Sequence, residues 1–553
     1  MLGSQDLIAP PTQGTLGAVN ADGKLKMLWQ LALTLSAAAA VLSVARRAWV
    51  SRIPTVVVIA ATFFATMALA YTAAAIWANS GDEYGYLYVA RTLLHWRTYN
   101  PPPPVPELFD FSWIGIRDGK MASQLPPGGP AVLSPFVAMH IAPLANPLLT
   151  VALGVLLLAC LRQLKASAPT SSALVALIML SPFTLFNGAS LFNHMQAAVA
   201  VMAICWLQLR DEANEGIWNR FLIGFFLSIG LVTRPEVFAI TAFVLGIDYL
   251  VRQRLRSFRA LPPLIAGTLP VTALWLAYNY SITGNPLLPT YVWSHFGSVR
   301  FEVGSLRAFI NMTTLLLRFS SAALLLLYVL ALWTRLRSGA ARFFDLLFPA
   351  AVLFFEFFPN AAGHQYGPRY WFFAWPTIAL TIGSTLSARF LSAEHDDFVD
   401  IVAQASLALR PARTLSPLKR PLSRQLRVHL PTLAAAQLVG YLSFAVVFTA
   451  VLRDYVDARR VVYTTLVSRQ PAVVLVPNRE IRLSPWQTPP FFASASEFTR
   501  NGFSYNDPVL YGRGDNPRLI ERACTLPHRT VYVWESPTAL RTVNCPQLSI
   551  GSQ

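Results

Sequence analysis

The chain has 553 residues, of which 54% are hydrophobic and only 13% are charged, and its mean hydropathy is +0.46. A soluble protein carries roughly a quarter charged residues, so the composition excludes an ordinary soluble enzyme and indicates a polytopic membrane protein. The net charge of +17 does not indicate nucleic-acid binding, because the basic residues form short clusters between apolar runs instead of one patch with interleaved aromatics.

Apolar runs long enough to cross a bilayer as a helix, near 20 residues, recur along the chain. A polar segment, 1–26, precedes the first run and does not have the pattern of a cleavable signal peptide. We expect an α-helical polytopic protein with about 11–13 transmembrane helices. The candidate spans lie near 27–45, 54–77, 146–163, 171–189, 195–209, 218–233, 236–251, 260–280, 310–334, 343–361, 371–392 and 431–452.

Lysines and arginines cluster in every second loop, and this sets the orientation because basic loops are retained in the cytoplasm. The last cluster, 393–430, is rich in proline and is interpreted as a cytoplasmic linker. We therefore expect a transmembrane domain over 27–452, whereas the orientation of 27–45 stays open. The loops expected on the periplasmic side are 78–145, 187–195, 233–236, 281–309, 360–370 and the tail after 452.

The first periplasmic loop, 78–145, opens with two adjacent carboxylates, Asp82 and Glu83, directly after a span. Aromatic residues at positions 84, 86 and 88 then predict a helix lying in the membrane interface. Prolines and glycines follow, including the run Gln124–Pro130, and predict a rigid path to a second interfacial helix near 131–143. Such a loop suits the wall of a cavity.

The tail, 453–553, is predicted to form a small α/β domain on the periplasmic side. Its β-prone runs, Ala472–Val476 and Thr530–Trp534, alternate with turn-rich pieces. Cys524 and Cys545 are its only cysteines, and in an oxidising compartment a disulfide between them would close a loop of about 20 residues, worth about 3 kcal/mol.

Four of the expected periplasmic segments carry ionisable or aromatic residues that the topology brings to one membrane face. Guanidinium groups hold an anionic phosphate through paired hydrogen bonds, and a carboxylate can take the proton from an attacking hydroxyl. The combination is therefore typical of transfer of a group off a phosphate. The candidate residues are Asp82, Glu83, His194, Arg234, Glu236, His364, Arg369 and Tyr370.

Each candidate also has a structural interpretation. The acidic pair could cap the first turn of its helix. The two arginines could extend to lipid headgroups, and the histidines could be hydrogen-bonded interface residues. Glu356, in a span near its outer end, is another acid that the membrane makes costly and that could serve the chemistry instead.

Taken together, these stretches resemble the GT-C glycosyltransferases, which include protein O-mannosyltransferases and the lipid A aminoarabinose transferases. An apolar span ending in Asp82 and Glu83, followed by an aromatic helix, is similar to the first outer loop of that group. Further matches occur in the family's order over roughly 54–392. They are Leu125–Pro130, Leu231–Glu236, Asn279 with Thr283–Pro286, and Gly367–Tyr370 with Pro376.

The resemblance implies an inverting transferase of a bacterial inner membrane that moves a sugar from a polyprenyl-phosphate donor to a hydroxyl of a lipid, polysaccharide or protein acceptor. Asp82 would be the general base, Glu83 would orient the acceptor or a metal, and Arg234 and Arg369 would bind the lipid phosphate. The turn at 233–236 lacks the lysine of some relatives, so Arg234 would take that role. Metal use varies in the family, so a divalent cation is left open and no cofactor is predicted with certainty.

Two other functions remain as alternatives. A transporter or flippase of lipid-linked sugars should carry ionisable or helix-breaking positions near the midplane in two corresponding halves, whereas here the unusual residues gather at one face. A polysaccharide polymerase or ligase of the same face would share the arginines without needing the acid pair.

Overall fold

The fold is described from a computed structural model of the chain. It describes residues 54–75, 78, 80–109, 113–213, 216–253, 257–293, 306–357, 366–387, 422–467, 471–476, 501–514, 516–536 and 539–545. The expected polar segment 1–26 and the candidate span 27–45 lie outside these residues.

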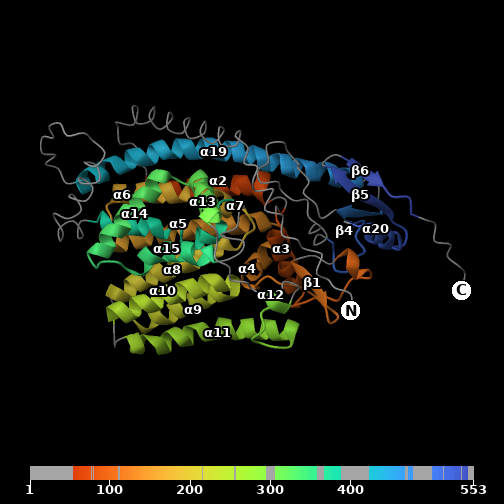
Figure 1. The fold of residues 1–553 in the computed structure, drawn as a ribbon, viewed down its shortest axis with the longest axis horizontal. Helices are drawn as coiled ribbons and strands as arrows, with labels where there is room; N and C mark the ends of the chain where they lie inside the picture. The colour runs from red at the N-terminus through yellow and green to blue at the C-terminus, as the bar shows by residue number, and fades with distance from the viewer. Residues whose placement is uncertain are drawn as a thin grey trace, which may run out of the picture.

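Most of the described chain is helical and forms one bundle, on which a small sheet domain is placed at one end (Figure 1). One group of helices contributes much of the buried core of the bundle. It consists of α2 (Thr55–Leu69), the π-helical turn η2 (Ala70–Ala74), α5 (Ala145–Gln163), α6 (Ala168–Met179), α7 (Pro182–Ala189) and α8 (His194–Ala213).

A second group of helices packs against α8 at the lower side of the bundle in Figure 1: α9 (Ile217–Thr233), α10 (Pro235–Gln253) and α11 (Ser257–Thr283). Helices α9 and α11 approach through Gly224 and Gly267, where a Cβ atom would collide with the facing backbone. Small residues allow the close backbone approach that stabilises helix pairs in a membrane, where hydrophobic burial adds little.

Further helices belong to the described part of the bundle. They are α12 (Thr290–Trp293), α13 (Leu306–Phe319), α14 (Ala322–Arg337), α15 (Phe343–Glu356), the 3-10 turn η6 (Arg369–Ala374), α16 (Thr377–Thr385) and α19 (Leu422–Val467). Helix α19 is 46 residues long and runs along the bundle as far as the sheet domain (Figure 1). The domain boundaries expected at 430 and 452 both fall inside this helix.

The first loop folds into the short elements that connect α2 with α5: α3 (Gly81–Leu94), η3 (Pro106–Leu108), β1 (Ile114–Arg117), β2 (Lys120–Ser123), α4 (Gly128–Ala138) and η4 (Ala142–Leu144). Helices α3 and α4 correspond to the two expected interfacial helices, and they pack against each other. Strands β1 and β2 form an antiparallel hairpin whose turn residues, Asp118 and Gly119, both have positive φ. Asp-Gly is a strong signal for such a turn.

The C-terminal domain has a four-stranded sheet in the order β4-β3-β5-β6. Its elements are β3 (Ala472–Val476), β4 (Val509–Arg513), α20 (Pro517–Cys524), β5 (Thr530–Ser536) and β6 (Ala539–Thr542). Strand β3 pairs in parallel with β4 and β5, and β6 is antiparallel to β5. The expected α/β tail is confirmed, as are the two strands foreseen in it. The expected disulfide is present between Cys524 and Cys545, whose Cα atoms lie 5.5 Å apart.

The sheet domain shares a hydrophobic core with the first loop. The buried strand residues Val474 and Leu510 belong to the same cluster as Tyr88 of α3 and Leu108 of η3. Phe503, which precedes β4, packs edge-on against the ring of Tyr88 at a centroid distance of 5.6 Å. The tail is therefore a structural neighbour of the helix that carries the acidic pair.

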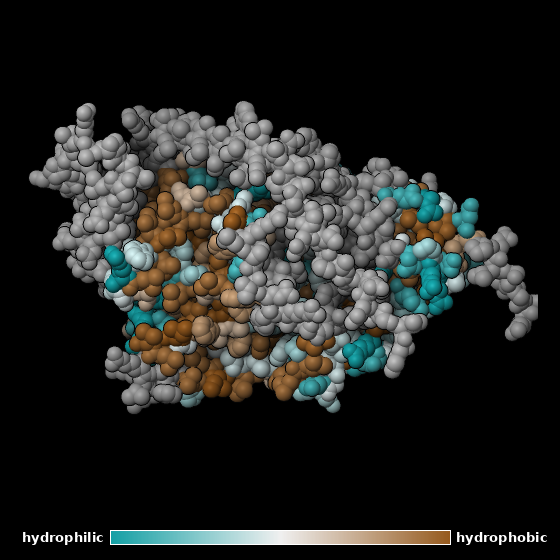
Figure 2. Space-filling view, in the orientation of Figure 1, coloured by the Kyte–Doolittle hydropathy of each residue, from teal (hydrophilic) through white to brown (hydrophobic). Residues whose placement is uncertain are grey.

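Apolar side chains cover the helical body and polar side chains gather over the sheet domain, as the described surface in Figure 2 shows. In the described part of the chain, four helices are long and apolar enough to cross a membrane, or up to six if each of two bent pairs counts as one span. The protein is thus a multi-pass membrane protein with a small α/β domain, as expected. The four helices that are long and apolar enough are Thr55–Ala74, Ala142–Gln163, Leu261–Thr283 and Leu433–Ala450.

Candidate functional site

The candidate site begins in the first turn of α3, whose conformation depends on residues close to it in the sequence. The Ser80 side chain caps the helix, and its Oγ accepts a hydrogen bond from the Glu83 amide at 3.2 Å. At Gly81 a Cβ atom would collide with the indole of Trp113, so only glycine fits. The acids do occupy a helix N-terminus, as the structural interpretation requires, but Ser80 supplies a cap and the acids themselves are buried.

Asp82 contacts Arg369, which lies far from it in the sequence. Its Oδ2 accepts a hydrogen bond from Arg369 Nη2 at 2.6 Å, across a sequence separation of 287 residues. Asp82 and Arg369 are only 9% and 8% exposed. A charge-assisted contact of this length and burial is strong, and breaking a buried ion pair by removing one partner is costly.

Glu83 has a different environment from its neighbour. It is fully buried, and its Oε1 accepts a hydrogen bond from the Leu191 amide at 2.8 Å. Leu191 lies in the connection between α7 and α8. The second acid therefore anchors α3 to this connection and has no exposed surface to offer to a substrate.

Arg234 lies at the turn between α9 and α10 and is 8% exposed. It forms an ion pair with Glu236 through Nη2. Its Nη1 lies 3.3 Å from His194 Nε2 and 3.5 Å from Asn193 Oδ1. Asn193 in turn donates from Nδ2 to the Thr233 carbonyl at 2.8 Å. Among the described residues, no hydrogen-bond acceptor reaches the buried Nε of Arg234.

Aromatic rings join the two arginines. The ring centroid of Tyr370 lies 4.6 Å from Arg234 Cζ and 5.5 Å from Arg369 Cζ. The Phe192 ring lies 4.4 Å from Arg369 Cζ, and cation–π contacts at these distances hold a guanidinium in a fixed orientation. The turns that carry His194, Arg234 and Arg369 thus meet the acidic pair at one place.

His194 is buried and remains neutral at ordinary pH. It lies just before the apolar part of α8. Burial and then the charges of Arg234 and Arg369 hold the pKa of His194 well below its ordinary value. Because an arginine only donates, Nε2 of His194 must accept from Arg234, and the proton is then on Nδ1. His194 therefore adds no positive charge to the cluster.

Tyr86 is a site residue that the sequence analysis treated only as an interfacial aromatic. It lies one helical turn after Asp82 and is 3% exposed. Burial and the charge of Asp82 raise the pKa of Tyr86, whereas Arg234 and Arg369 oppose this effect. Its phenol therefore keeps its proton beside both arginines. The spacing of four residues from the acid was the available signal.

The proline-glycine run after the hairpin positions α4 against the two turns. A Cβ atom at Gly128 would lie 2.7 Å from the Val232 carbonyl oxygen, and one at Gly129 would lie 2.6 Å from Asn193 Cβ. Both distances are shorter than real Cβ contacts allow. These glycines therefore permit α4 to pack on the segments that hold Arg234 and His194.

Seven of the eight candidate residues are brought together in this way. The eighth, His364, lies outside the described residues. Glu356 is the last residue of α15, and its Oε2 is buried with no hydrogen-bond partner among the described residues. In the same part of the chain, no group of three or more His, Cys, Asp or Glu side chains is arranged to hold a metal ion.

No family model matches the chain, and no curated protein matches its sequence. Solved structures do. The structure of ArnT from Cupriavidus metallidurans bound to undecaprenyl phosphate is 13% identical, with a TM-score of 0.55, and the match covers 86% of this chain and 92% of that chain. The apo state of the same protein gives a TM-score of 0.56 at 13% identity, with the same coverage.

A third match is the archaeal oligosaccharyltransferase AglB from Archaeoglobus fulgidus, in complex with an inhibitory peptide and a dolichol-phosphate. It is 10% identical with a TM-score of 0.39, and the match covers 69% of this chain and 56% of that chain. The likeness to ArnT, which covers 86% of this chain and 92% of that chain, shows that the two proteins share a fold, and the expected helical membrane architecture is confirmed.

Proposed function

We propose that this protein is a membrane glycosyltransferase that moves a sugar from a polyprenyl-phosphate donor to an acceptor hydroxyl. The acceptor is a lipid, a polysaccharide or a protein. The reaction takes place on the periplasmic side of a bacterial inner membrane, the side that the basic loops assign to the acidic pair. The fold shared with ArnT supports this proposal, as does the undecaprenyl phosphate bound in one ArnT structure.

One observation carries the proposal. The Asp82 carboxylate contacts Arg369 at 2.6 Å, and both Arg369 and Arg234 lie against the Tyr370 ring. A base and two cationic groups are thus collected at one buried place, although they come from distant segments of the chain. A reaction that abstracts a proton and releases a phosphate needs both kinds of group.

The proposed step is a single displacement. The acceptor hydroxyl oxygen attacks the anomeric carbon of the donor, and its proton goes to Asp82. The bond between that carbon and the phosphate oxygen breaks, and the electron pair stays on the phosphate. Arg369 and Arg234 stabilise the charge that grows there, which matters most where water is scarce. One displacement inverts the anomeric centre and requires no covalent intermediate.

The ion pair between Asp82 and Arg369 is compatible with a site that binds an anionic substrate. When a donor phosphate binds Arg369, it competes with Asp82 for the guanidinium and frees the carboxylate to accept a proton. A guanidinium offers five N–H donors in a planar fork. Arg369 can therefore exchange a carboxylate for a phosphate without a large movement of its side chain.

In this proposal, the other candidate residues act by positioning Asp82, Arg234 and Arg369. Glu83 positions α3 through the Leu191 amide. Glu236 and neutral His194 hold Arg234 from opposite ends of its guanidinium. Tyr370 orients both arginines through its ring. Each of these is therefore a positioning residue in the proposed reaction.

The test is release of polyprenyl phosphate by the purified full-length protein from a set of polyprenyl-phosphate sugars. We expect Asp82→Asn to bind the donor that the wild type uses and to lose turnover, by about 100-fold or more for a general base. Asp118→Asn is the matched control, because Asp118 is an acid of the same loop whose side chain is 71% exposed.

Full activity of Asp82→Asn would reject Asp82 as the base and return the acidic pair to a purely structural role. Movement of intact donor across a vesicle membrane without release of polyprenyl phosphate would identify a flippase instead. Loss of activity in Asp118→Asn equal to that in Asp82→Asn would show that the assay reports general damage to the loop.

A further inference from the structure

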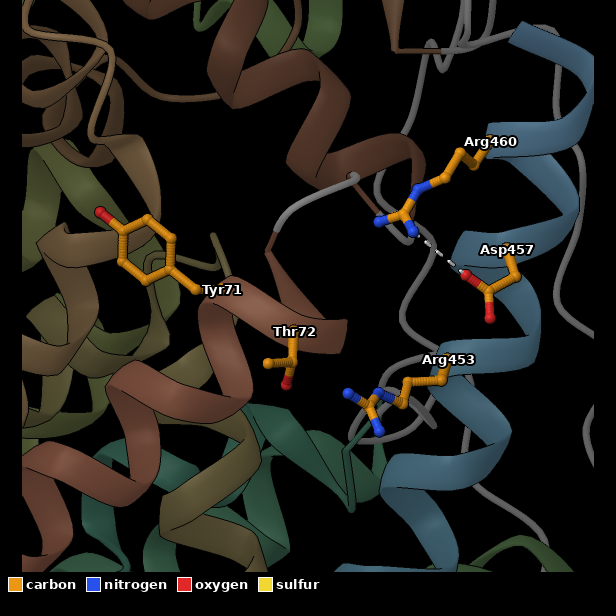
Figure 3. Close-up of a pocket in the computed structure, with 5 residues that line it drawn as sticks. All are labelled: Tyr71, Thr72, Arg453, Asp457 and Arg460. Carbon is orange, nitrogen blue, oxygen red and sulfur yellow. Dashed lines mark ion pairs between the residues drawn. The ribbon is translucent and has the colours of Figure 1, made fainter. Parts of the chain in front are cut away.

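A pocket of about 360 Å³ lies between η2 and α19, apart from the cluster around Asp82. Five residues line it: Tyr71, Thr72, Arg453, Asp457 and Arg460. Figure 3 shows that the two arginine side chains reach from α19 toward η2, with Thr72 facing them. None of these residues has a part in the proposed reaction.

The pocket lies where two helices leave the apolar layer. Tyr71 and Thr72 are near the end of the candidate span Thr55–Ala74. On the other side, the candidate span Leu433–Ala450 ends three residues before Arg453 (453 − 450 = 3). Both walls of the pocket therefore lie at the same boundary, which is the level of lipid headgroups.

The pocket has an excess of positive charge. Arg453 and Arg460 are seven residues apart and so lie on the same side of α19. Asp457 contacts Arg460 at 3.7 Å, and both side chains are more than half exposed. Such an exposed pair is weak. Within the described part of the chain, Arg453 has no ion-pair partner.

The backbone of the other wall is irregular. Residues Ala70–Ala74 form a π-helical turn, closed by a hydrogen bond from the Ala75 amide to the Ala70 carbonyl at 3.1 Å. Turns of this kind are rare and occur frequently at functional sites. Here the turn lies directly opposite the two arginines.

We propose that this pocket binds the phosphate of an anionic lipid headgroup, at a second site separate from the donor phosphate site. Two guanidinium groups on one helix face suit a phosphate, to which each can donate more than one hydrogen bond. The position at the end of two spans favours a phosphate attached to a lipid over free phosphate, because acyl chains can then lie along the apolar surface of α2 and α19.

The test is titration of the detergent-solubilised full-length protein with phosphatidylglycerol, with bound lipid counted by native mass spectrometry. Replacing both arginines, Arg453→Gln with Arg460→Gln, should weaken binding by at least about ten-fold, since each basic residue near an anionic lipid contributes on this scale. The matched control is Arg97→Gln with Arg518→Gln, which removes two exposed arginines away from the pocket, one in the first loop and one in the C-terminal domain.

Asp457→Asn supplies a second and opposite prediction. Removing this carboxylate takes one negative charge out of the pocket and should tighten phosphatidylglycerol binding about two- to five-fold, the scale of an exposed ion pair. Damage to the fold cannot produce tighter binding, so this variant decides the question even if the double arginine variant fails to fold.

Three outcomes would overturn the proposal. The first is equal binding of phosphatidylglycerol by the wild type and the double variant. The second is weaker or unchanged binding by Asp457→Asn. The third is displacement of the lipid by millimolar inorganic phosphate, which would identify a site for free phosphate. Because lipid binding is measured without turnover, none of these results depends on the proposed transferase activity.

Discussion

Gly128 offers a direct test of how the first loop supports the site. A Cβ atom at this position would lie 2.7 Å from the Val232 carbonyl oxygen and 2.8 Å from Thr233 Oγ1, whereas ordinary contact begins at 3.4 Å. Gly128→Ala must therefore push α4 away from the turn by about 0.7 Å (3.4 − 2.7 = 0.7). Thr233 directly precedes Arg234, so the movement passes to the guanidinium that we assign to the donor phosphate.

Two magnitudes follow. Overpacking of this kind costs about 1–3 kcal/mol of stability. A misplacement on the order of 1 Å can cost about 100-fold in rate, so for a smaller shift we expect turnover of the polyprenyl-phosphate sugar to fall about ten-fold or more. Weaker binding of polyprenyl phosphate itself should accompany this loss, because Arg234 moves and Asp82 does not.

Gly246→Ala is the control, since it lies inside α10 and a Cβ atom there meets nothing within 4 Å. This variant should keep full turnover and gain slightly in stability, because alanine is favoured over glycine in a helix. Turnover, polyprenyl phosphate binding and thermal unfolding in detergent are to be measured for both variants. Unchanged turnover and unchanged unfolding temperature in Gly128→Ala would refute the close approach of α4 to the Arg234 turn.

Three further predictions concern stability. Asp345→Ala should destabilise the protein by about 3–5 kcal/mol in denaturant unfolding, because it breaks the buried ion pair between Asp345 and Arg335, whose atoms lie 2.8 Å apart and whose side chains are 0% and 4% exposed. Replacing Cys524 and Cys545 by serine should lower the stability of the tail by about 3 kcal/mol, measured by limited proteolysis, since the disulfide closes a separation of 21 residues. The pKa of His194 is held well below its ordinary value by burial and by the two arginines, so below about pH 6.5 the unfolded chain binds a proton that the folded chain does not. Stability therefore falls on acidification through this pH, and His194→Gln should reduce that fall.

Controls keep these results specific. Glu535→Gln breaks an exposed ion pair with Arg541 and should change stability by at most about 1 kcal/mol, in contrast to Asp345→Ala. A loss from Glu535→Gln equal to that from Asp345→Ala would contradict the role of burial. An acid-side loss of stability that is as large in His194→Gln as in the wild type would contradict the neutral state of His194.

The sequence predicted the parts of this protein that depend on local pattern. Apolar runs gave the membrane character, and alternation with turn residues gave strands β3 and β5. The hairpin β1–β2 was missed although Asp118-Gly119 was visible as a turn signal. The length of α19 could not be foreseen, because a proline-containing basic stretch before the span favoured a linker, whereas packing along the bundle extends the helix.

The site was foreseen as a set of residues but not as a set of contacts. Topology alone brought the turns with Asp82, Arg234 and Arg369 to one face. It could not show that Asp82 and Glu83, adjacent in sequence, point to different partners. Side chains one residue apart on a helix diverge by about 100°, and which one meets Arg369 depends on how α3 is rotated against the bundle.

That rotation is determined by contacts on three sides of α3. Trp113 packs on Gly81 at the start of the helix, and Glu83 ties the first turn to the connection after α7. Tyr88 enters the core that the C-terminal sheet completes. The sheet domain can therefore influence the proposed reaction without contacting the substrate. By packing on the middle of α3, the sheet domain helps to fix the direction in which the Asp82 side chain points. Disrupting this packing should therefore change the orientation of Asp82, although the sheet domain lies at the other end of the sequence.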